Sequence, residues 1–292
     1  MKQLGFIGAG NMGEALIRGL LERKVFKAAD IIAADPEPKR RRKLARALGV
    51  ETTTENREVL ADAAAIVLAV KPQIIDGVLE EIRSALDQSA SPDGDRSGLA
   101  NRGAKTKLKP GRLFISIAAG ITLDHLERRL GPRARVVRVM PNAPAMVGRG
   151  MTAVVRGSRA SKADETLTLR IFGAVGHTVA LKEEAALDAV TALSGSGPAY
   201  VYLFAKALAD AAASEGIEPR LALRMTLQTL AGAIVMMENS GLSPDELIRM
   251  VASPGGTTEA ALRKFAEAGF AAGVAEAVRA AAARSRELGA IS

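Results

Sequence analysis

The sequence of 292 residues contains no cysteine, no tryptophan and two histidines, with seven Phe and two Tyr as its aromatic residues. Without cysteine the chain has no disulfide framework, no thiolate nucleophile and no Cys-ligated zinc or iron–sulfur cluster. His125 and His177 are too few for a typical His-based metal site or a Ser-His-Asp triad. We interpret both as structural, His125 on a charged helix and His177 in a turn, and we expect no metal.

Long apolar runs are also missing. The longest internal run, residues 63–70, is far shorter than the ~20 residues that span a bilayer. Near the N-terminus, Glu14 and Arg18 interrupt the apolar stretch and no cleavage signal follows. We therefore expect a soluble, cytoplasmic protein with no membrane contact.

The formal net charge of +8 comes from two segments rather than from an extended basic surface. Residues 39–43 (KRRRK) contribute five positive charges, and residues 88–110 hold five basic and two acidic residues. Nucleic-acid-binding proteins usually combine a basic stripe with stacking aromatic residues. Because aromatic residues are scarce here, we expect no nucleic-acid partner.

The first half of the chain alternates short apolar runs with helical patterns, which is typical of an α/β fold. The nearly unbroken apolar strands predict a Rossmann-type, doubly wound parallel sheet with both faces covered. We expect strands over residues 3–7, 31–34, 64–70, 113–118, 135–139 and 152–155, and helices over residues 12–22, 39–48, 74–86 and 123–130.

The second half shows alanine-rich helical periodicity and no convincing strand. Pro219 suits a first helical position, Gly241 a helix end, and Ser243 to Glu246 a capping box. We therefore predict a dinucleotide-binding domain over residues 1–182 and an all-helical domain over 183–292. The polar segment at about 89–107 is interpreted as a mobile surface insertion; a basic lid over an anionic ligand is the alternative.

A glycine motif follows the first expected strand and opens the first expected helix. Its first glycine permits a tight turn, its second lets the backbone approach a pyrophosphate, and its third lets the helix pack on the sheet. Unpaired N–H groups at the helix start then favour phosphate. A glycine-rich turn without a ligand is the alternative. The expected cofactor-binding residues are Gly8, Ala9, Gly10, Asn11, Met12 and Gly13.

Asp35 ends the second expected strand, 22 residues after Gly13. An acidic residue at this place can accept hydrogen bonds from the ribose hydroxyls, which favours NAD(H). Arg40, Arg41 and Arg42 follow closely and could neutralise a 2′-phosphate, or they could form a solvated helix face. The sequence leaves the choice between NADPH and NADH open.

Two further strand ends belong at the same edge of the sheet, where ligands bind in open α/β folds. Their small residues would leave room for a ring, although ordinary strand-terminating turns explain either segment alone. The segments are Ala69, Val70, Lys71 and Pro72 after one strand, and Ala118, Ala119 and Gly120 after the other.

A helix break and a second anion-binding loop lie in the second half. Residues 194–200 (SGSGPAY) interrupt a helical run, because proline and glycine weaken a helix. We expect this break to allow a close approach of another element and to form a pocket wall. Residues 253–258 (SPGGTT) precede a helix near Glu259 and offer three hydroxyl groups and backbone N–H groups to a carboxylate. Plain capping by Thr257 or Gly256 is the alternative.

Six segments together resemble the pyrroline-5-carboxylate reductase family in order and spacing: GFIGAGNMG, VLAVKP, ISIAAGI, RVMPNAPAMVGRG, VTALSGSGPAY and SPGGTTEAAL. The resemblance runs from Leu4 to about Leu288, and the last three segments are specific to that family. It implies reduction of 1-pyrroline-5-carboxylate to L-proline, the last step of proline biosynthesis, with hydride from NADPH or NADH. It also implies a homodimer or higher oligomer through the C-terminal helices.

The resemblance further implies roles for individual residues. The cofactor would lie along residues 8–13, with Asp35 and Asn56 at the ribose and with residues 69–72, Ala118 and Ala119 nearby. Thr258 would hydrogen-bond the ring nitrogen of the substrate. The implied substrate-binding residues are Glu184, Ser253, Gly255, Gly256, Thr257 and Thr258. Ala143 departs from the family motif, in which threonine is usual.

Two other functions fit parts of the sequence. A β-hydroxyacid dehydrogenase would need a basic lysine on the interdomain helix, where this chain has Val201 and Tyr202, with Lys206 further along. A non-catalytic NAD(P)-sensing module would need the glycine loop and would have no use for the loop at residues 253–258.

Overall fold

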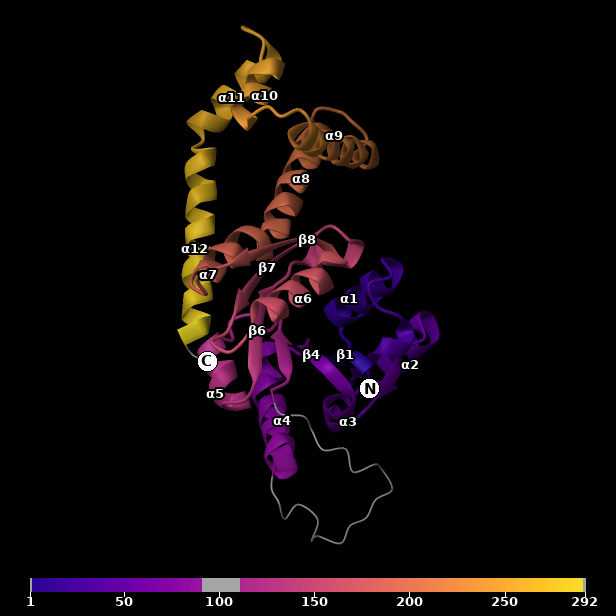
Figure 1. The fold of residues 1–292 in the computed structure, drawn as a ribbon. Coiled ribbons are helices and arrows are strands. Elements are labelled where there is room, and N and C mark those ends of the chain that lie inside the picture. The colour runs from indigo at the N-terminus through magenta and orange to yellow at the C-terminus, as the bar shows by residue number, and fades with distance from the viewer. Residues whose placement is uncertain (1, 91–110, 291–292) are drawn as a thin grey trace. The chain divides into compact units, whose positions relative to one another are not determined.

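A computed structural model describes residues 2–90 and 111–290. Its eight strands form one sheet in the order β3-β2-β1-β4-β5-β6-β7-β8 (Figure 1). All neighbouring strands are parallel except β6 and β7. The strands are β1 (Lys2–Ile7), β2 (Ile31–Ala34), β3 (Glu51–Thr53), β4 (Ala63–Leu68), β5 (Leu113–Ser116), β6 (Arg135–Met140), β7 (Gly150–Arg156) and β8 (Gly176–Leu181).

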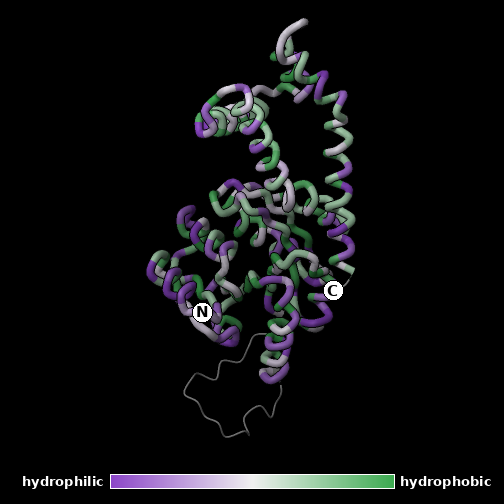
Figure 2. The backbone as a smooth tube through the Cα atoms, turned by 180° about the vertical axis from the view of Figure 1, so that it is seen from behind, coloured by the Kyte–Doolittle hydropathy of each residue, from purple (hydrophilic) through white to green (hydrophobic). Residues whose placement is uncertain are grey.

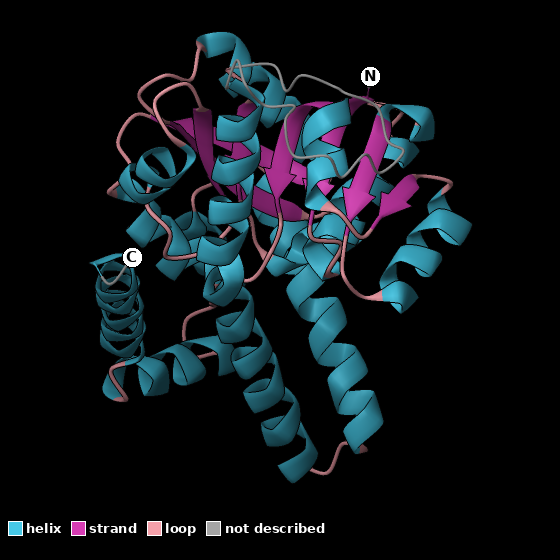
Figure 3. Cartoon of the chain, turned by 90° about the horizontal axis from the view of Figure 1, so that it is seen from below, coloured by secondary structure: helices cyan, strands magenta, loops and turns pink. Residues whose placement is uncertain are grey.

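Helices cover both faces of this sheet (Figure 3). The strands carry apolar residues on both faces, so successive residues of β4 enter opposite cores: Val67 packs with one hydrophobic cluster, and Ile66 and Leu68 pack with the other. Helices α1, α2 and α6 supply the first cluster, and α3, α4, α5 and α7 the second. Their bounds are α1 (Asn11–Glu22), α2 (Pro38–Leu48), α3 (Asn56–Asp62), α4 (Ile75–Ala90), α5 (Leu123–Leu130), α6 (Lys162–Gly173) and α7 (Ala186–Val190).

The Rossmann-type sheet confirms the expected fold class, with three corrections. The pair β6 and β7 is antiparallel, because the connection between them contains only the short helix Ala143–Val147 and no α-helical crossover. Strands β3 and β8 and helices α3 and α6 are additions to the expected elements. The expected turn at His177 is wrong, since His177 lies within β8 and pairs with Met151.

The described chain divides into two compact units, one of residues 196–281 and one of the rest. The division lies after Gly195, beyond the boundary expected at residues 182 and 183. Leu187 in α7 and Ala192 in the following π-helix Thr191–Gly195 are buried in the sheet unit. The last residues of α12 (Phe270–Ala290) also belong to the sheet unit. Helix α4 includes Ser89, and the remainder of the insertion expected at 89–107, apart from Ala90, lies outside the described residues.

The second unit is helical, as expected, and contains α8 (Gly197–Ser214), α9 (Pro219–Asn239), α10 (Pro244–Val251), α11 (Thr257–Glu267) and the first part of α12. Hydrophobic residues are spread along α8 and α9 (Figure 2), and Leu227 and Val235 of α9 are more than half exposed. By length and composition alone, helix α9 could span a membrane, and 11% of its most apolar 18 residues are buried.

Candidate functional site

The order in which the chain adds strands to the sheet reverses between β1 and β4. From β1 the chain adds β2 and β3 on one side, and then continues with β4, β5 and β6 on the other. In open α/β sheets, ligands bind at the carboxyl ends of the strands beside such a switch point. The loops that follow β1 and β4 meet there: the amide of Ala69 donates to the carbonyl of Ile7 at 2.8 Å. The structure therefore brings together the expected glycine loop and the segment at residues 69–72.

The three glycines of the loop have different surroundings. Gly8 has a φ of +99°, and a Cβ there would lie 2.6 Å from the carbonyl oxygen of Ala69. A Cβ on Gly13 would lie 2.7 Å from the carbonyl oxygen of Gly8, whereas a Cβ on Gly10 would meet nothing within 4 Å. Packing thus requires glycine at the two outer positions. At Gly10 the backbone faces open space at the start of α1, which fits the close approach of a pyrophosphate.

Asp35 lies directly after β2 and faces inward. The residue is 3% exposed. Its Oδ2 accepts a hydrogen bond from the amide of Ala9 at 2.9 Å, and its Oδ1 accepts one from the amide of Glu37 at 2.9 Å. The carboxylate of Asp35 therefore holds the glycine loop to the end of β2. Its expected contact with the ribose stays a prediction.

The remaining expected cofactor residues lie at the same edge. Asn56 opens α3, and its Nδ2 donates to Glu81 Oε2 at 2.7 Å. Lys71 is exposed and precedes a short helix that begins at Pro72. Ala118 is buried and its amide donates to Ser116 Oγ at 3.3 Å. The ends of β1, β2, β3, β4 and β5 thus each contribute one expected segment to a single edge of the sheet.

Glu184 has partners that the sequence did not suggest. Its Oε1 accepts a hydrogen bond from the amide of Leu123, the first residue of α5, at 2.7 Å. The same oxygen lies 2.5 Å from Nη1 of Arg138, which belongs to β6 and is 9% exposed. A buried charge needs a partner, so the arginine within the apolar strand RVVRVM was the available signal. Glu184 therefore joins α5 to β6.

The expected helix break is present and allows the close approach that we anticipated. After α7 the chain forms the π-helix, and α8 begins with Pro198 in its first turn. Nδ2 of Asn142 donates to the carbonyl and the hydroxyl oxygen of Ser194, both at 3.1 Å. A Cβ on Gly195 would lie 2.8 Å from Met140 Cε. The motif after β6 is thus tied to the break, while a pocket wall at this place stays a prediction.

The loop at residues 253–258 opens α11 in the helical unit. Gly255 has a φ of +69°, and Gly256 is the N-cap of α11. Thr257 and Thr258 are the first two helical residues, where backbone N–H groups have no partner within the helix. Oε2 of Glu259 accepts a hydrogen bond from the amide of Gly255 at 2.6 Å. The amide of Gly255, which was expected to bind the substrate's carboxylate, therefore already donates to a carboxylate of the chain itself, that of Glu259.

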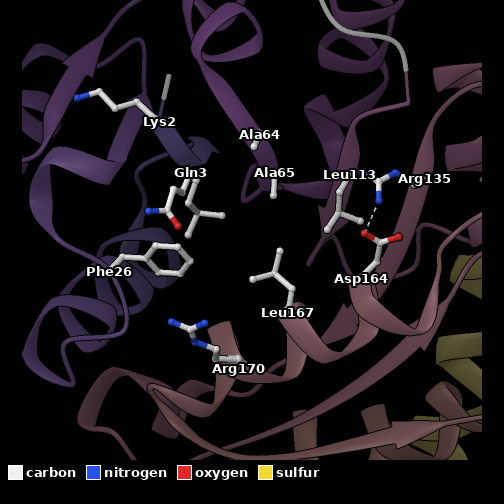
Figure 4. A pocket seen from close by; sticks show the side chains of 11 residues that line it. Lys2, Gln3, Phe26, Ala64, Ala65, Leu113, Arg135, Asp164, Leu167 and Arg170 are labelled. Atoms are coloured by element: carbon white, nitrogen blue, oxygen red, sulfur yellow. Dashed lines mark hydrogen bonds and ion pairs between the residues drawn. The ribbon is translucent and has the colours of Figure 1, made fainter.

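A cavity of about 300 Å³ lies at the opposite edge of the sheet. Figure 4 shows Phe26, Leu113 and Leu167 around it. Its charged side chains have partners: Arg135 Nη1 lies 2.5 Å from Asp164 Oδ1, Lys2 Nζ lies 2.9 Å from Glu51, and Arg170 donates to the carbonyl of Val25 at 3.1 Å. Because it is at the amino ends of the strands, where dinucleotides do not bind in this fold, we do not assign the cofactor to it.

His125 makes a side-chain contact between two helices, whereas His177 lies in β8. Nε2 of His125 in α5 lies 2.6 Å from Asp76 Oδ1 in α4. The hydrogen bond from His125, with a further contribution from Arg129, holds the pKa of Asp76 below its usual value. His125 thus joins two helices. Among the described residues there is no group of three or more His, Asp or Glu side chains suited to a metal ion.

Comparisons with known proteins agree with this architecture. A family model described as "NADP oxidoreductase coenzyme F420-dependent" matches residues 3–90, and one described as "Pyrroline-5-carboxylate reductase dimerisation" matches residues 184–288. Pyrroline-5-carboxylate reductase of Pseudomonas aeruginosa is 41% identical over 98% of this chain and 96% of its own length. The enzyme of Methanosarcina acetivorans is 37% identical over 99% of this chain and 98% of its own.

Solved structures give the same result. The pyrroline-5-carboxylate reductase of Coxiella burnetii is 33% identical, with a TM-score of 0.85 over 98% of both chains. The pyrroline carboxylate reductase of Plasmodium falciparum, determined with NADP bound, is 30% identical, with a TM-score of 0.81 over 99% of this chain and 98% of its own. These likenesses cover both units of the chain. The chain therefore belongs to the pyrroline-5-carboxylate reductase family.

Proposed function

We propose that the protein reduces 1-pyrroline-5-carboxylate to L-proline with NADPH or NADH. The observation that carries this proposal is the match to reductases of this family over nearly the whole chain, including the helical half that a cofactor-binding module alone would not need. The open backbone at Gly10 fits the cofactor. When bound, that cofactor supplies the hydride.

The residues of the second loop suit the substrate. A protonated C=N group is already electrophilic, so the reaction needs neither a metal nor a covalent nucleophile. We propose that Oγ1 of Thr258 accepts a hydrogen bond from the protonated ring nitrogen. The N–H group of Thr257 and the hydroxyl of Ser253 would donate to the carboxylate. The N–H groups of Gly255 and Gly256 would join them on leaving Glu259 Oε2 and the carbonyl oxygen of Ser253, their present acceptors at 2.6 and 3.0 Å. Positioning the ring in this way contributes through proximity rather than acid–base chemistry.

Glu184 is proposed as a further substrate contact. Among the described residues, Leu123 and Arg138 both bond to its Oε1, which leaves Oε2 to accept a hydrogen bond from the substrate. The Glu184 side chain is 28% exposed, while that of Arg138 is 11% exposed. Arg138 would thus fix the direction of the carboxylate.

We also propose that two copies of the chain associate through α8 to α12. Helix α9 exposes large apolar residues, and only 11% of its most apolar window is buried. Burying such a face against another protomer is favourable, at roughly 25 cal/mol for each Å² of apolar surface. The dimerisation model over residues 184–288 supports this assignment. A cytoplasmic location, without membrane or nucleic-acid partners, is part of the proposal. The substrate and the cofactor are small polar molecules, and the excess basic residues are confined to two segments in a chain with few aromatic residues.

A kinetic assay tests the proposed reaction. Purified protein should oxidise NADPH or NADH only when 1-pyrroline-5-carboxylate is present, and proline should accumulate in equal amount. Thr258→Ala should lower kcat/KM for the imine by about tenfold, the effect of one charge-assisted hydrogen bond, with an unchanged Kd for the cofactor. Thr166→Ala is the matched control, because Thr166 is an exposed helical threonine in the sheet unit.

The outcomes separate the alternatives. Unchanged kcat/KM in Thr258→Ala would refute the role of Thr258, and no imine-dependent oxidation by the wild type would refute the reaction. Oxidation of a β-hydroxyacid would instead point to a dehydrogenase. The structure does not favour that outcome, since Nζ of Lys206 lies 2.5 Å from Asp210 on an exposed helical face.

A further inference from the structure

We propose that the last turns of α12, residues 282–290, position Glu184 for the substrate, and that Ser285 and Leu288 are the positioning residues. The proposal rests on the substrate contact proposed for Glu184 above. Residues 282–290 belong to the sheet unit, whereas the first part of α12 belongs to the helical unit. The contacts of these last turns reach both of the segments that hold Glu184.

Glu184 is attached to α7 through its backbone and to α5 through its side chain. Its carbonyl oxygen accepts a hydrogen bond from the amide of Leu187 at 2.9 Å, in the first turn of α7. Its Oε1 accepts the amide of Leu123 at 2.7 Å, at the start of α5, and also contacts Arg138 in β6. The direction of the carboxylate therefore depends on where the start of α5 lies relative to α7.

Ser285 holds α7. Its Oγ donates to Oδ1 of Asp188 at 2.6 Å, and it is the one buried residue of α12. Asp188 follows Glu184 by four residues, which is about one helical turn. Helix α7 has five residues, far fewer than a helix needs to be stable without tertiary contacts. The hydrogen bond from Ser285 therefore stabilises the turn that carries Glu184.

The final turn of α12 contacts the loop that leads from β5 to α5. A Cβ on Gly120 would lie 3.4 Å from Cβ of Leu288. A Cβ on Gly289 would lie 3.7 Å from Cγ2 of Thr122, which is the N-cap of α5. The next residue, Leu123, carries the amide that binds the carboxylate. The packing of α12 on this loop therefore helps to set the position of that amide.

The two contacts act on one carboxylate. Ser285 and Leu288 are three residues apart, so they lie on the same side of α12. The first bonds to the turn that carries Glu184, and the second packs on the loop that precedes its amide partner. One helix thus fixes the two segments relative to each other, and with them the direction of Oε2 of Glu184, the oxygen left for the substrate.

Kinetics and hydrogen exchange on the full chain test the proposal. For Ser285→Ala and Leu288→Ala, alone and combined with Glu184→Gln, we would measure kcat, KM for the imine and Kd for NADPH. The exchange rate of the Leu123 amide, followed by NMR, reports on its bond to Glu184 without requiring turnover. Ser84→Ala is the matched control, because Ser84 is an exposed helical serine of the sheet unit that also makes a side-chain hydrogen bond.

Ser285→Ala and Leu288→Ala should each raise KM for the imine about three- to tenfold, the effect of weakening one hydrogen bond. Both should speed exchange of the Leu123 amide, while kcat and Kd for NADPH stay within about twofold of the wild type. In the Glu184→Gln background the same substitutions should change KM by less than about twofold, because they act through Glu184. Asp188→Asn keeps an acceptor for Ser285 and should resemble the wild type, whereas Asp188→Ala should resemble Ser285→Ala.

The proposal is overturned if KM is unchanged in both variants, if its rise is as large in the Glu184→Gln background, or if exchange of the Leu123 amide is unchanged. Should Ser285→Ala fail to fold, Leu288→Ala decides, because Leu288 is 46% exposed and its truncation leaves no buried cavity. A wild type without imine-dependent oxidation of NADPH or NADH would refute the proposed reaction, whereas hydrogen exchange tests the positioning of Glu184 separately.

Discussion

Replacing the second and third glycines of the cofactor loop by alanine should separate ligand binding from folding. In Gly13→Ala the new methyl group would lie 2.7 Å from the carbonyl oxygen of Gly8. Overpacking of this kind costs up to about 3 kcal/mol, and the better helix propensity of alanine offsets about 1 kcal/mol. A net loss of about 2 kcal/mol should lower Tm by about 4–8 °C for a unit of this size.

Gly10→Ala should have the opposite profile. Gly10 has a φ of −68° and a ψ of −173°, which alanine also adopts, and the added methyl group meets nothing within 4 Å. Tm should therefore stay within about 2 °C of the wild type, as for a substitution that changes stability by less than about 0.5 kcal/mol. The methyl group would stand where the pyrophosphate approaches, so Kd for NADPH should rise at least about tenfold.

Thermal melts and calorimetric titrations with NADPH measure both quantities on the same samples. The reasoning is refuted if Gly10→Ala binds the cofactor as tightly as the wild type, or if Gly13→Ala melts at the wild-type temperature. Loss of stability in Gly10→Ala would show that its surroundings are not open.

Three further predictions concern hydrogen bonds that the structure shows. Glu259→Gln should lower KM for the imine about two- to fivefold, because a charged competitor leaves the loop amide; a higher KM would contradict this. Arg138→Leu should lower the free energy of unfolding by about 2 kcal/mol, because Glu184 loses its ion-pair partner in a mostly buried place. Denaturant titration measures this free energy, and an unchanged value would contradict the prediction. Ser285→Ala removes the 2.6 Å bond to Asp188 that attaches the end of α12 and should lower Tm by about 2–4 °C, whereas an unchanged melt would mean that this end is not held.

Much of the fold could be predicted from the sequence, because buried parallel strands are continuous apolar runs. Residues 31–34 were predicted to be a strand and are one. The short β3 over Glu51–Thr53 was missed, because a three-residue edge strand of Glu and Thr has no apolar pattern. The strand β8 was also missed, because its first half, Gly176 to Thr178, is not apolar and leaves an apolar run of three residues. A strand at residues 152–155 was predicted and lies within β7, but its antiparallel direction was not, since strand direction depends on how the connection folds.

Site residues could be predicted where only one residue type satisfies the local packing. Gly8 and Gly13 are required by contacts that any side chain would violate, so their spacing identified the loop. Carboxylates were harder, because they bind backbone amides as readily as ligands. Asp35 and Glu184 both bond to amides of their own chain. Those partners are far away in the sequence, and no local pattern reports them.

In both proposed binding loops, a carboxylate of the chain accepts a hydrogen bond from a backbone amide, but the two carboxylates differ in burial. Asp35 accepts the amide of Ala9 in a buried place, and Glu259 accepts the amide of Gly255 in an exposed one. Breaking the buried bond leaves a desolvated donor, whereas the exposed amide can exchange one acceptor for another with little loss. We therefore expect the glycine loop to keep its shape when the cofactor binds. In the second loop, the carboxylate of the substrate should replace that of Glu259, so that binding exchanges one charge-assisted hydrogen bond for another.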